Sequence, residues 1–189
     1  MNAPLRKPMS REEFLAWEGR QELRYEFDGF QPIAMTGGTV EHAIIQRNLL
    51  TALNARLRGK PCCVFGSHLK IAVAGSIRYP DAFVMCSQVP RGAQVIEDPV
   101  VVFEVISPST ATTDRVVKNR EYRDTASVVR YVMLDQFRPA ATVFERMGDD
   151  WVGHILEPPA ALLMPEIGIE LPLTEVYEGV DFPETLDDD

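Results

Sequence analysis

The chain of 189 residues has no hydrophobic run long enough to cross a membrane. A transmembrane helix needs about 20 consecutive apolar residues, and no stretch of the sequence reaches that length. Residues 1–8 carry charges with no apolar stretch behind them, so we expect no signal peptide. These absences predict a cytoplasmic protein with no membrane association.

Cysteine and aromatic residues are also scarce. The chain has three cysteines, Cys62, Cys63 and Cys86, and because two of them are adjacent they make a poor disulfide framework. No Cys-x-x-Cys pair offers the spacing of a structural zinc site. Two Trp and five Tyr are few for a protein that stacks aromatic rings on sugars, which disfavours a carboxylate-pair glycosidase.

Basic residues are missing from the last part of the chain. All 19 Lys and Arg lie in residues 1–146, where the net charge is +3, whereas residues 147–189 have a net charge of −12. The overall charge of −9 is therefore a C-terminal feature and does not exclude a nucleic-acid partner. We expect the acidic tail to be a solubilising end; the alternative is a segment that competes with a polyanion for a basic face.

Hydrophobic periodicity and turn residues predict alternating helices and strands. A capping box at Ser10 and Glu13 begins the first helix, and Asp28-Gly29 marks a hairpin turn. Helices are expected at residues 10–19, 40–58 and 113–124, and strands at 23–27, 30–35, 62–65, 69–73, 77–86, 100–106, 128–134, 141–146 and 151–156, with a surface loop at 87–99 and a short apolar piece at 167–173. This order predicts an α/β (α+β) fold with a mixed central β-sheet flanked by helices. We expect a flexible start at 1–8, one domain at 9–177 and the acidic tail at 178–189.

Two isolated carboxylates stand out in apolar strands. Asp81 lies within residues 77–86, and Glu104 follows four apolar residues in the strand 100–106. Such runs are typical of strands buried on both faces, where a carboxylate is costly unless something compensates its charge. A shared divalent cation with oxygen ligands is one compensation. The alternative is a buried acid pair held by backbone donors.

Several motifs together make the chain resemble a known family. They are Tyr25-Glu26 and Asp28-Gly29, His42, Pro80-Asp81, the run from Glu104 to Thr110, and the spaced residues Asp114, Lys118 and Tyr122. With these residues the chain resembles the Uma-type endonucleases, within the PD-(D/E)xK restriction-endonuclease-like superfamily, over about residues 9–177. The run Glu-Val-x-Ser-Pro-Ser-Thr followed by Asp-x-x-x-Lys-x-x-x-Tyr carries most of the specificity.

The resemblance implies a fold, a site and a reaction. It implies a restriction-endonuclease-like fold with Asp81 and Glu104 as catalytic ligands of Mg²⁺ or Mn²⁺ and with Glu26 nearby. The implied reaction is the hydrolysis of a phosphodiester, for which such an ion neutralises the phosphate and activates a water molecule. It also implies nucleic acid, most simply DNA, as the partner, and a homodimer formed through the hairpin 141–156 or the C-terminal segment.

One position departs from the superfamily pattern. The catalytic lysine expected two residues after the second acid is replaced by Ile106. Lys118 is the nearest substitute, because Asp114, Lys118 and Tyr122 follow one another at steps of four and share one face of a helix. We predict that this face points back at Glu104 and that Lys118 is catalytic. The alternative is an ordinary helix pair of Asp114 and Lys118.

Other residues have two interpretations each. Glu26 either supports the site or pairs with Arg24 or Lys70 across strands. His42 is either a supporting site residue or a core histidine. Three arginines gather near Lys118 and are predicted to contact a phosphate backbone beside the metal site, although such a group is more often a solvated face. They are Arg115, Arg120 and Arg123.

The residues thus favour a divalent-metal-dependent endonuclease. The alternative from another class is a non-catalytic module that binds nucleic acid or protein and retains the nuclease fold, which the missing lysine and the acidic tail favour. Metal-dependent cleavage of plasmid DNA distinguishes the two.

Overall fold

The computed structural model of the protein describes residues 8–89, 91–107 and 112–182. Three sequence features fall at least partly outside this part of the chain. They are the predicted flexible start at 1–8, the end of the run from Glu104 to Thr110, and the last residues of the predicted acidic tail at 178–189.

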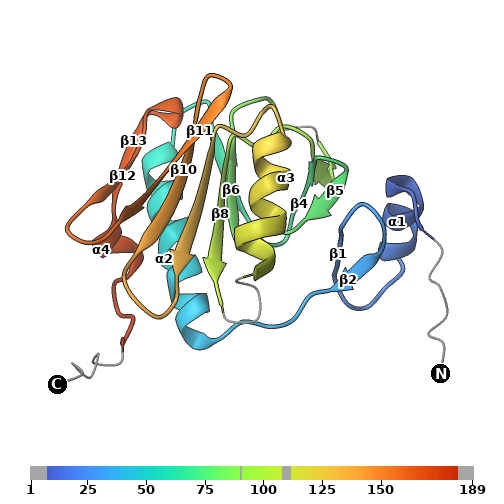
Figure 1. The fold of residues 1–189 in the computed structure, drawn as a ribbon, viewed down its shortest axis with the longest axis horizontal. Coiled ribbons are helices and arrows are strands. Elements are labelled where there is room, and N and C mark those ends of the chain that lie inside the picture. Colours follow the sequence, from blue (N-terminus) through green and yellow to red (C-terminus); the bar gives the residue numbers. More distant parts are fainter. Residues whose placement is uncertain (1–7, 90, 108–111, 183–189) are drawn as a thin grey trace.

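A six-stranded mixed sheet forms the centre of the molecule (Figure 1). Its strands lie in the order β11-β10-β9-β8-β6-β3, with β8 and β9 parallel and the other neighbours antiparallel. Their bounds are Cys63–Gly66 (β3), Ala82–Met85 (β6), Val101–Ile106 (β8), Arg130–Asp135 (β9), Ala141–Met147 (β10) and Asp150–Leu156 (β11). The mixed central sheet confirms the predicted fold class.

The remaining strands form two smaller sheets. A five-stranded sheet has the order β2-β1-β5-β4-β7, and β12 pairs with β13. The bounds are Tyr25–Phe27 (β1), Pro32–Ala34 (β2), Lys70–Val73 (β4), Ser76–Arg78 (β5), Val95–Ile96 (β7), Ala161–Met164 (β12) and Ile169–Pro172 (β13). The predicted hairpin at Asp28-Gly29 is therefore an edge of the five-stranded sheet.

Helices cover both faces of the central sheet (Figure 1). On one face the helix α2 (Val40–Leu57) buries the predicted stripe of Ile45, Leu49, Leu53 and Leu57. On the other face Tyr122 of α3 (Asn119–Asp124) packs among strand side chains. The chain also forms α1 (Arg11–Glu18), which has the predicted capping box, a 3₁₀ turn η2 (Pro165–Ile167) and a short α4 (Leu173–Val176).

The segment before α3 is wound more widely than an α-helix. Residues Thr113–Lys118 form a π-helical turn, η1, which continues directly into α3. The sequence predicts a single helix over 113–124, because periodicity does not separate a π turn from an α turn. Such turns are rare and occur often at functional sites. Here the turn leaves both Asp114 and Lys118 buried.

Two strand predictions need correction. Residues 77–86 are not one strand but end one sheet and begin another, since β5 belongs to the five-stranded sheet and β6 to the six-stranded sheet. Pro80 has no N–H to continue a ladder, which explains the break and leaves Asp81 just before β6 rather than inside a strand. The predicted loop at 87–99 contains the short β7, which pairs in parallel with β4.

The prediction of a poor disulfide framework is also wrong, because Cys62 and Cys86 form a disulfide. Cys63 lies opposite Met85 in the antiparallel pair β3–β6, which brings the flanking cysteines together across the two strands. A sequence separation of 24 residues gives no hint of this pairing. Cys63 is free and exposed.

Candidate active site

The predicted acids line one cleft of about 650 Å³. Arg24 lines it just before β1, and its other charged or titratable lining residues come from five segments: β1, the start of α2, the turn before β6, β8 and η1. They include Glu26, His42, Asp81, Glu104, Asp114 and Lys118. We call this the carboxylate cleft. The structure therefore brings both predicted metal ligands and four of the predicted neighbouring residues to one place.

Asp81 and Glu104 face this cleft because their strands are neighbours. Ala82 lies opposite Phe103 in the antiparallel pair β6–β8, so the two acids flank that pair at the same end of the sheet. The backbone N–H of Val105 donates to Asp81 Oδ2 at 2.7 Å. This contact between the two strands fixes the Asp81 carboxylate in the cleft, and the shared cation stays a prediction.

His42 holds the other oxygen of Asp81. His42 Nε2 lies 2.8 Å from Asp81 Oδ1, and the Gln46 side-chain amide donates to the Asp81 carbonyl oxygen at 2.9 Å. Burial opposes protonation of His42, but the hydrogen bond and charge of Asp81 outweigh it, so the pKa of His42 is raised. His42 therefore donates to Asp81 and is neither an isolated core histidine nor a free base.

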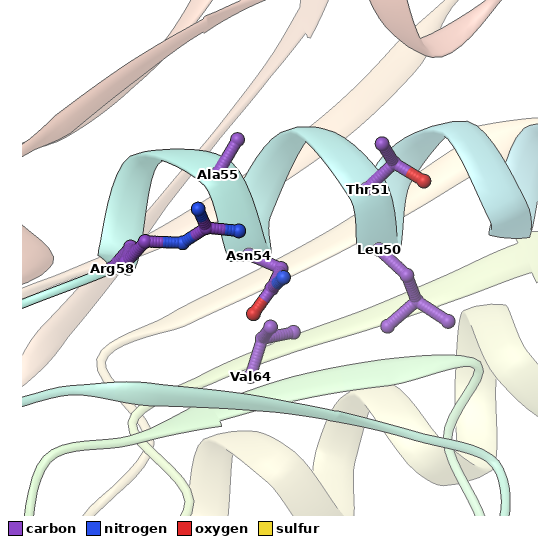
Figure 2. Close-up of a pocket in the computed structure, with 6 residues that line it drawn as sticks. All are labelled: Leu50, Thr51, Asn54, Ala55, Arg58 and Val64. Carbon is purple, nitrogen blue, oxygen red and sulfur yellow. The ribbon is translucent and has the colours of Figure 1, made fainter.

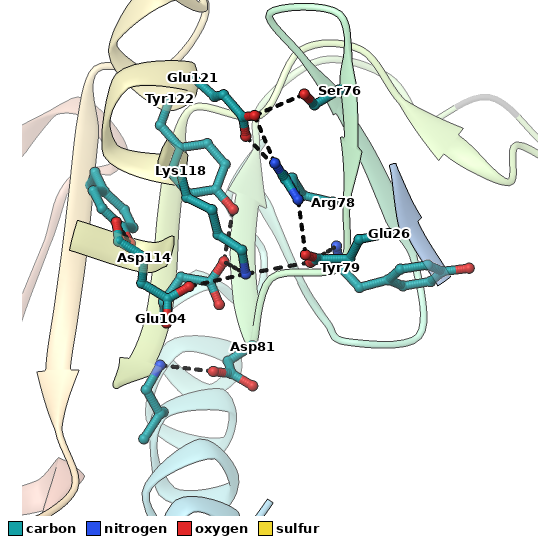
Figure 3. A network of polar contacts seen from close by, with 12 residues as sticks. Glu26, Ser76, Arg78, Tyr79, Asp81, Glu104, Asp114, Lys118, Glu121 and Tyr122 are labelled. Carbon is teal, nitrogen blue, oxygen red and sulfur yellow. Dashed lines mark hydrogen bonds and ion pairs between the residues drawn. The ribbon is translucent and has the colours of Figure 1, made fainter. Parts of the chain in front are cut away.

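Glu104 is nearly enclosed, with 4% of its surface exposed. Its Oε1 accepts hydrogen bonds from Lys118 Nζ at 3.0 Å and from the Tyr122 hydroxyl at 2.7 Å (Figure 3). Burial raises the pKa of the Glu104 carboxyl to about 8; the ammonium of Lys118 opposes this, and the charges of Asp114, Asp81 and Glu26 add to it. Burial and the neighbouring carboxylates thus both favour the protonated form of Glu104.

Lys118 is the positive centre of the cleft. Its Nζ lies 3.0 Å from Glu104 Oε1, 3.1 Å from Asp114 Oδ1 and 3.3 Å from Glu26 Oε1. Burial opposes the charge, but the three carboxylates raise the pKa of Lys118 above its ordinary value, so the ammonium stays protonated. The predicted direction of Lys118 toward Glu104 is confirmed. Because the side chain is buried among these acids, its replacement should also cost stability.

Behind the cleft lies a buried ionic network that the sequence reasoning missed. Arg78 is fully buried and donates to both oxygens of Glu121, at 2.7 and 2.6 Å, and to Glu26 at 3.1 Å (Figure 3). The backbone N–H of Tyr79 donates to the other oxygen of Glu26. The predicted alternative partners of Glu26 are wrong: Arg24 bonds the Ser67 carbonyl and Lys70 pairs with Glu18.

The sequence does contain an indication that Arg78 is a buried, paired residue. It is a lone cation between Ile77 and Tyr79 in an apolar run, as Asp81 is a lone anion three residues later. A buried arginine needs carboxylate partners, and Glu26 on β1 and Glu121 on α3 supply them. Because Arg78 connects the hairpin to the helix that carries Lys118, it fixes the relative positions of Glu26 and Lys118.

The three predicted phosphate contacts do not line the carboxylate cleft. Arg115, Arg120 and Arg123 line a separate cleft of about 670 Å³, together with Arg146 of β10 and Trp151 of β11. We call these five residues the arginine cleft. Asp114 and Lys118 are buried toward the sheet, whereas Arg115 and Arg120 are exposed on the opposite side of the same helical segment. The arginines therefore lie across the helical segment from the predicted metal ligands, and their contact with a phosphate backbone stays a prediction.

A further hollow lies on the outer side of α2. It measures about 430 Å³ and is lined by six residues, which Figure 2 shows as Leu50, Thr51, Asn54, Ala55, Arg58 and Val64. This hollow contains no carboxylate, histidine or cysteine and only one charged group. It offers no constellation for acid–base or metal chemistry.

The raised pKa of Glu104 predicts a pH-dependent stability. The pKa of Glu104 is about 8 in the folded chain and 4.5 in its ordinary state. Between pH 4.5 and 8 the folded chain therefore keeps a proton on Glu104 that the unfolded chain has lost. The contribution of Glu104 is fully present below about pH 4.5 and is lost as the pH rises through about 8. We expect Glu104→Gln to reduce the fall in the free energy of unfolding between pH 5 and 8, measured by urea unfolding of the metal-free protein. An unchanged pH profile would contradict the assignment.

Comparison with known proteins places the chain in a family. Residues 11–174 match the family described as "Uma2: Putative restriction endonuclease". The chain belongs to the Uma2 family. It is 32% identical over 185 residues to the uncharacterized protein slr1290 of Synechocystis sp., covering 96% of this chain and 97% of that protein. A second uncharacterized Synechocystis protein, sll1609, is 25% identical over 148 residues, which are 76% of this chain and 84% of that one.

A solved structure supports the Uma2 fold. The crystal structure of a putative nuclease belonging to DUF820 from Anabaena variabilis superposes with a TM-score of 0.75. The match covers 90% of this chain and 98% of that chain at 19% sequence identity. At this identity the likeness concerns the fold, and it confirms the mixed sheet flanked by helices. Within the described residues, no helix is both long and apolar enough to span a membrane.

Proposed function

We propose that this Uma2 chain is a divalent-metal-dependent nuclease that hydrolyses phosphodiester bonds in DNA. The observation that carries the proposal is the convergence of Asp81 and Glu104 on one cleft with the buried ammonium of Lys118 against Glu104. Membership in the family described as "Putative restriction endonuclease" supports the same reaction class. Asp81, Glu104 and Lys118 would be the catalytic residues.

The donor chemistry of the cleft fits Mg²⁺ or Mn²⁺. Among the described residues no three His, Cys, Asp or Glu side chains form a ready-made metal site. Mg²⁺ does not need one, since it commonly takes one or two carboxylates and completes its shell with water and substrate phosphate oxygens. Asp81 and Glu104 would supply those carboxylates, and a cation there would compensate the burial and the neighbouring carboxylate charges that raise the pKa of Glu104.

The chain's own groups would prepare the cleft for the reaction. A bound Mg²⁺ or Mn²⁺ supplies charge neutralisation at the phosphate and a water molecule of lowered pKa. His42 and the Val105 N–H keep the Asp81 carboxylate in one orientation, and the Tyr122 hydroxyl does the same for Glu104. Lys118 holds a positive charge next to Glu104, where it can stabilise charge that develops on the phosphate.

Lys118 takes the role that Ile106 cannot fill. Ile106 is 5% exposed at the end of β8 and has no charge. Lys118 reaches Glu104 from the π turn η1 instead of from the strand. Asp114 and Glu26 would orient the ammonium rather than react, because each contacts it at 3.1 to 3.3 Å.

We expect Lys118→Met to lower the rate of plasmid cleavage by on the order of 10²-fold, because it removes one electrostatic contact in the transition state. The assay follows the conversion of supercoiled plasmid in Mg²⁺ or Mn²⁺, with EDTA as the metal-free reference. Lys70→Met is the matched control, since Lys70 is also a buried lysine paired with a carboxylate, Glu18, but lies outside the carboxylate cleft. Both variants lose stability, so both are compared at a temperature where they remain folded.

Equal cleavage by Lys118→Met and wild type would reject the catalytic role of Lys118. DNA binding by wild type without cleavage in either metal would support the non-catalytic module instead. The homodimer remains a prediction; a monomer in light scattering at micromolar concentration would reject it.

A further inference from the structure

The arginine cleft concentrates positive charge on an otherwise acidic protein. Arg115, Arg120 and Arg123 project from η1 and α3, and Arg146 and Trp151 come from the hairpin β10–β11. Two acids, Asp124 and Asp149, also line this cleft and leave a net excess of two positive charges. The whole chain, by contrast, carries a net charge of −9.

These arginines lack the ion pairs that other arginines of the protein have. In the described part of the chain, no carboxylate lies within ion-pairing distance of Arg115, Arg120 or Arg123, whereas Arg78 and Arg130 each contact two acids. Among the described residues, the acceptors of Arg146 are all neutral. These are the carbonyl oxygens of Val128, Arg123 and Thr125. The positive charge of the cleft is therefore available to an external anion.

Two of the guanidinium groups are held in place by Trp151. Arg146 Cζ lies 4.6 Å and Arg123 Cζ 5.8 Å from the centre of the indole ring. Such cation–π contacts restrict the side chains without neutralising them. Because the ring already contacts two cations, it serves to position the arginines rather than to stack on a nucleotide base. This arrangement suits phosphate groups better than bases.

The arginine cleft lies one helix away from the carboxylate cleft. Arg115 is next to Asp114 and Asn119 is next to Lys118, and the members of each pair line different clefts. The diameter of an α-helix with its side chains is ~10–12 Å, which corresponds to about three nucleotide steps at 3.4 Å along a strand. One nucleic acid can therefore reach both clefts.

The carboxylate cleft offers a polyanion few positive charges. The carboxylates of Glu26, Asp81, Glu104 and Asp114 line it, against the side-chain cations of Lys118 and Arg24. Before a metal ion binds, these carboxylates disfavour a phosphate group beside them. Affinity for a polyanion must come from elsewhere on the protein, and phosphate contacts dominate the affinity of proteins for nucleic acids.

We propose that the arginine cleft is a phosphate-backbone binding site, which holds the nucleic acid a few nucleotides from the bond to be cleaved. The proposal deepens the proposed nuclease function and rests on it for the nature of the ligand. Contacts of this kind fix the position and register of the nucleic acid and carry no base specificity. The site therefore contributes affinity that depends on salt and not on sequence.

The test is the binding of a fluorescently labelled DNA duplex, followed by anisotropy at several salt concentrations in EDTA, where no metal-dependent cleavage occurs. The test variant is Arg115→Gln/Arg120→Gln, because both side chains are exposed and bond no described residue. The control is Arg58→Gln/Lys60→Gln, which removes the same charge at the end of α2, on the opposite face of the central sheet. We expect the test variant to bind about tenfold or more weakly, with the slope of log K against log salt reduced by about two.

The outcomes separate this proposal from the nuclease function. Wild-type affinity and slope in the test variant, or an equal loss in the control, would overturn the phosphate site even if wild type cleaves plasmid. Weaker binding by the test variant, with no cleavage by wild type in Mg²⁺ or Mn²⁺, would support the site and reject the nuclease. Wild type that binds a poly-glutamate peptide but no duplex would overturn the proposal in favour of an acidic protein partner.

Discussion

Replacement of Arg78 by methionine should lower the free energy of unfolding by about 3–5 kcal/mol, the cost of breaking a buried ion pair by removing one partner. Arg78 is fully buried and holds Glu26 and Glu121, which are 8% and 7% exposed. Methionine fills much of the space but leaves the buried Glu121 without its cation and Glu26 with Lys118 alone. The loss is measured by urea unfolding at neutral pH.

The control for this prediction is Arg56→Met. Arg56 pairs with Glu175, but these side chains are 27% and 44% exposed, so solvent screens the pair and we expect a loss of about 1 kcal/mol or less. The double variant Arg78→Met/Glu121→Gln should recover part of the loss, because it removes one uncompensated charge. A loss for Arg78→Met no larger than that of the control would show that the network contributes little.

The largest expected effect on activity is that of Asp81→Asn. We expect it to reduce metal-dependent plasmid cleavage by on the order of 10³-fold or more, because a metal ion contributes several kcal/mol to the transition state and each 1.36 kcal/mol is a factor of ten in rate. Asparagine retains an acceptor for the Val105 N–H and the size of the side chain, so the fold should persist. The change removes the negative charge that a cation requires.

Asp28→Asn provides the matched control for this substitution. Asp28 accepts hydrogen bonds from the backbone N–H groups of Phe30 and Gln31 in the β1–β2 turn, which asparagine can also accept. Its charge lies outside the carboxylate cleft, so cleavage should stay at the wild-type level. If Asp81→Asn cleaves as fast as Asp28→Asn, Asp81 does not hold the metal.

Local patterns predicted the main elements of the fold. The capping box at Ser10 and the apolar stripe of α2 depend on neighbours within one or two turns, so the sequence contains the whole signal. The buried strand β8 is likewise visible as a continuous apolar run. The break at Pro80 and the disulfide of Cys62 with Cys86 depend on which sheet each strand joins, and a single sequence does not specify that.

In the candidate site, too, local patterns were predictable from the sequence and contacts between distant segments were not. Asp81, Glu104 and Lys118 were predicted from isolated charges in apolar strands and from helix spacing, and they meet in one cleft. The contacts of Arg78 with Glu121 and Glu26 join segments 43 and 52 residues apart, and the contact of Lys118 with Glu26 joins segments 92 residues apart. Helix spacing predicts that Asp114 and Lys118 share one face of the helical segment. It does not predict that Arg115 and Arg120 lie on the side that faces away from the sheet.

The central claim is that Asp81 and Glu104 share one divalent cation. Crystals of the wild-type protein soaked in Mn²⁺ test it directly through the anomalous signal of the metal. The account predicts one peak within coordinating distance of a carboxylate oxygen of Asp81 and one of Glu104, and no peak there in crystals of Asp81→Asn. Full Mn²⁺ occupancy elsewhere on the chain, with none between these two side chains, would contradict the account.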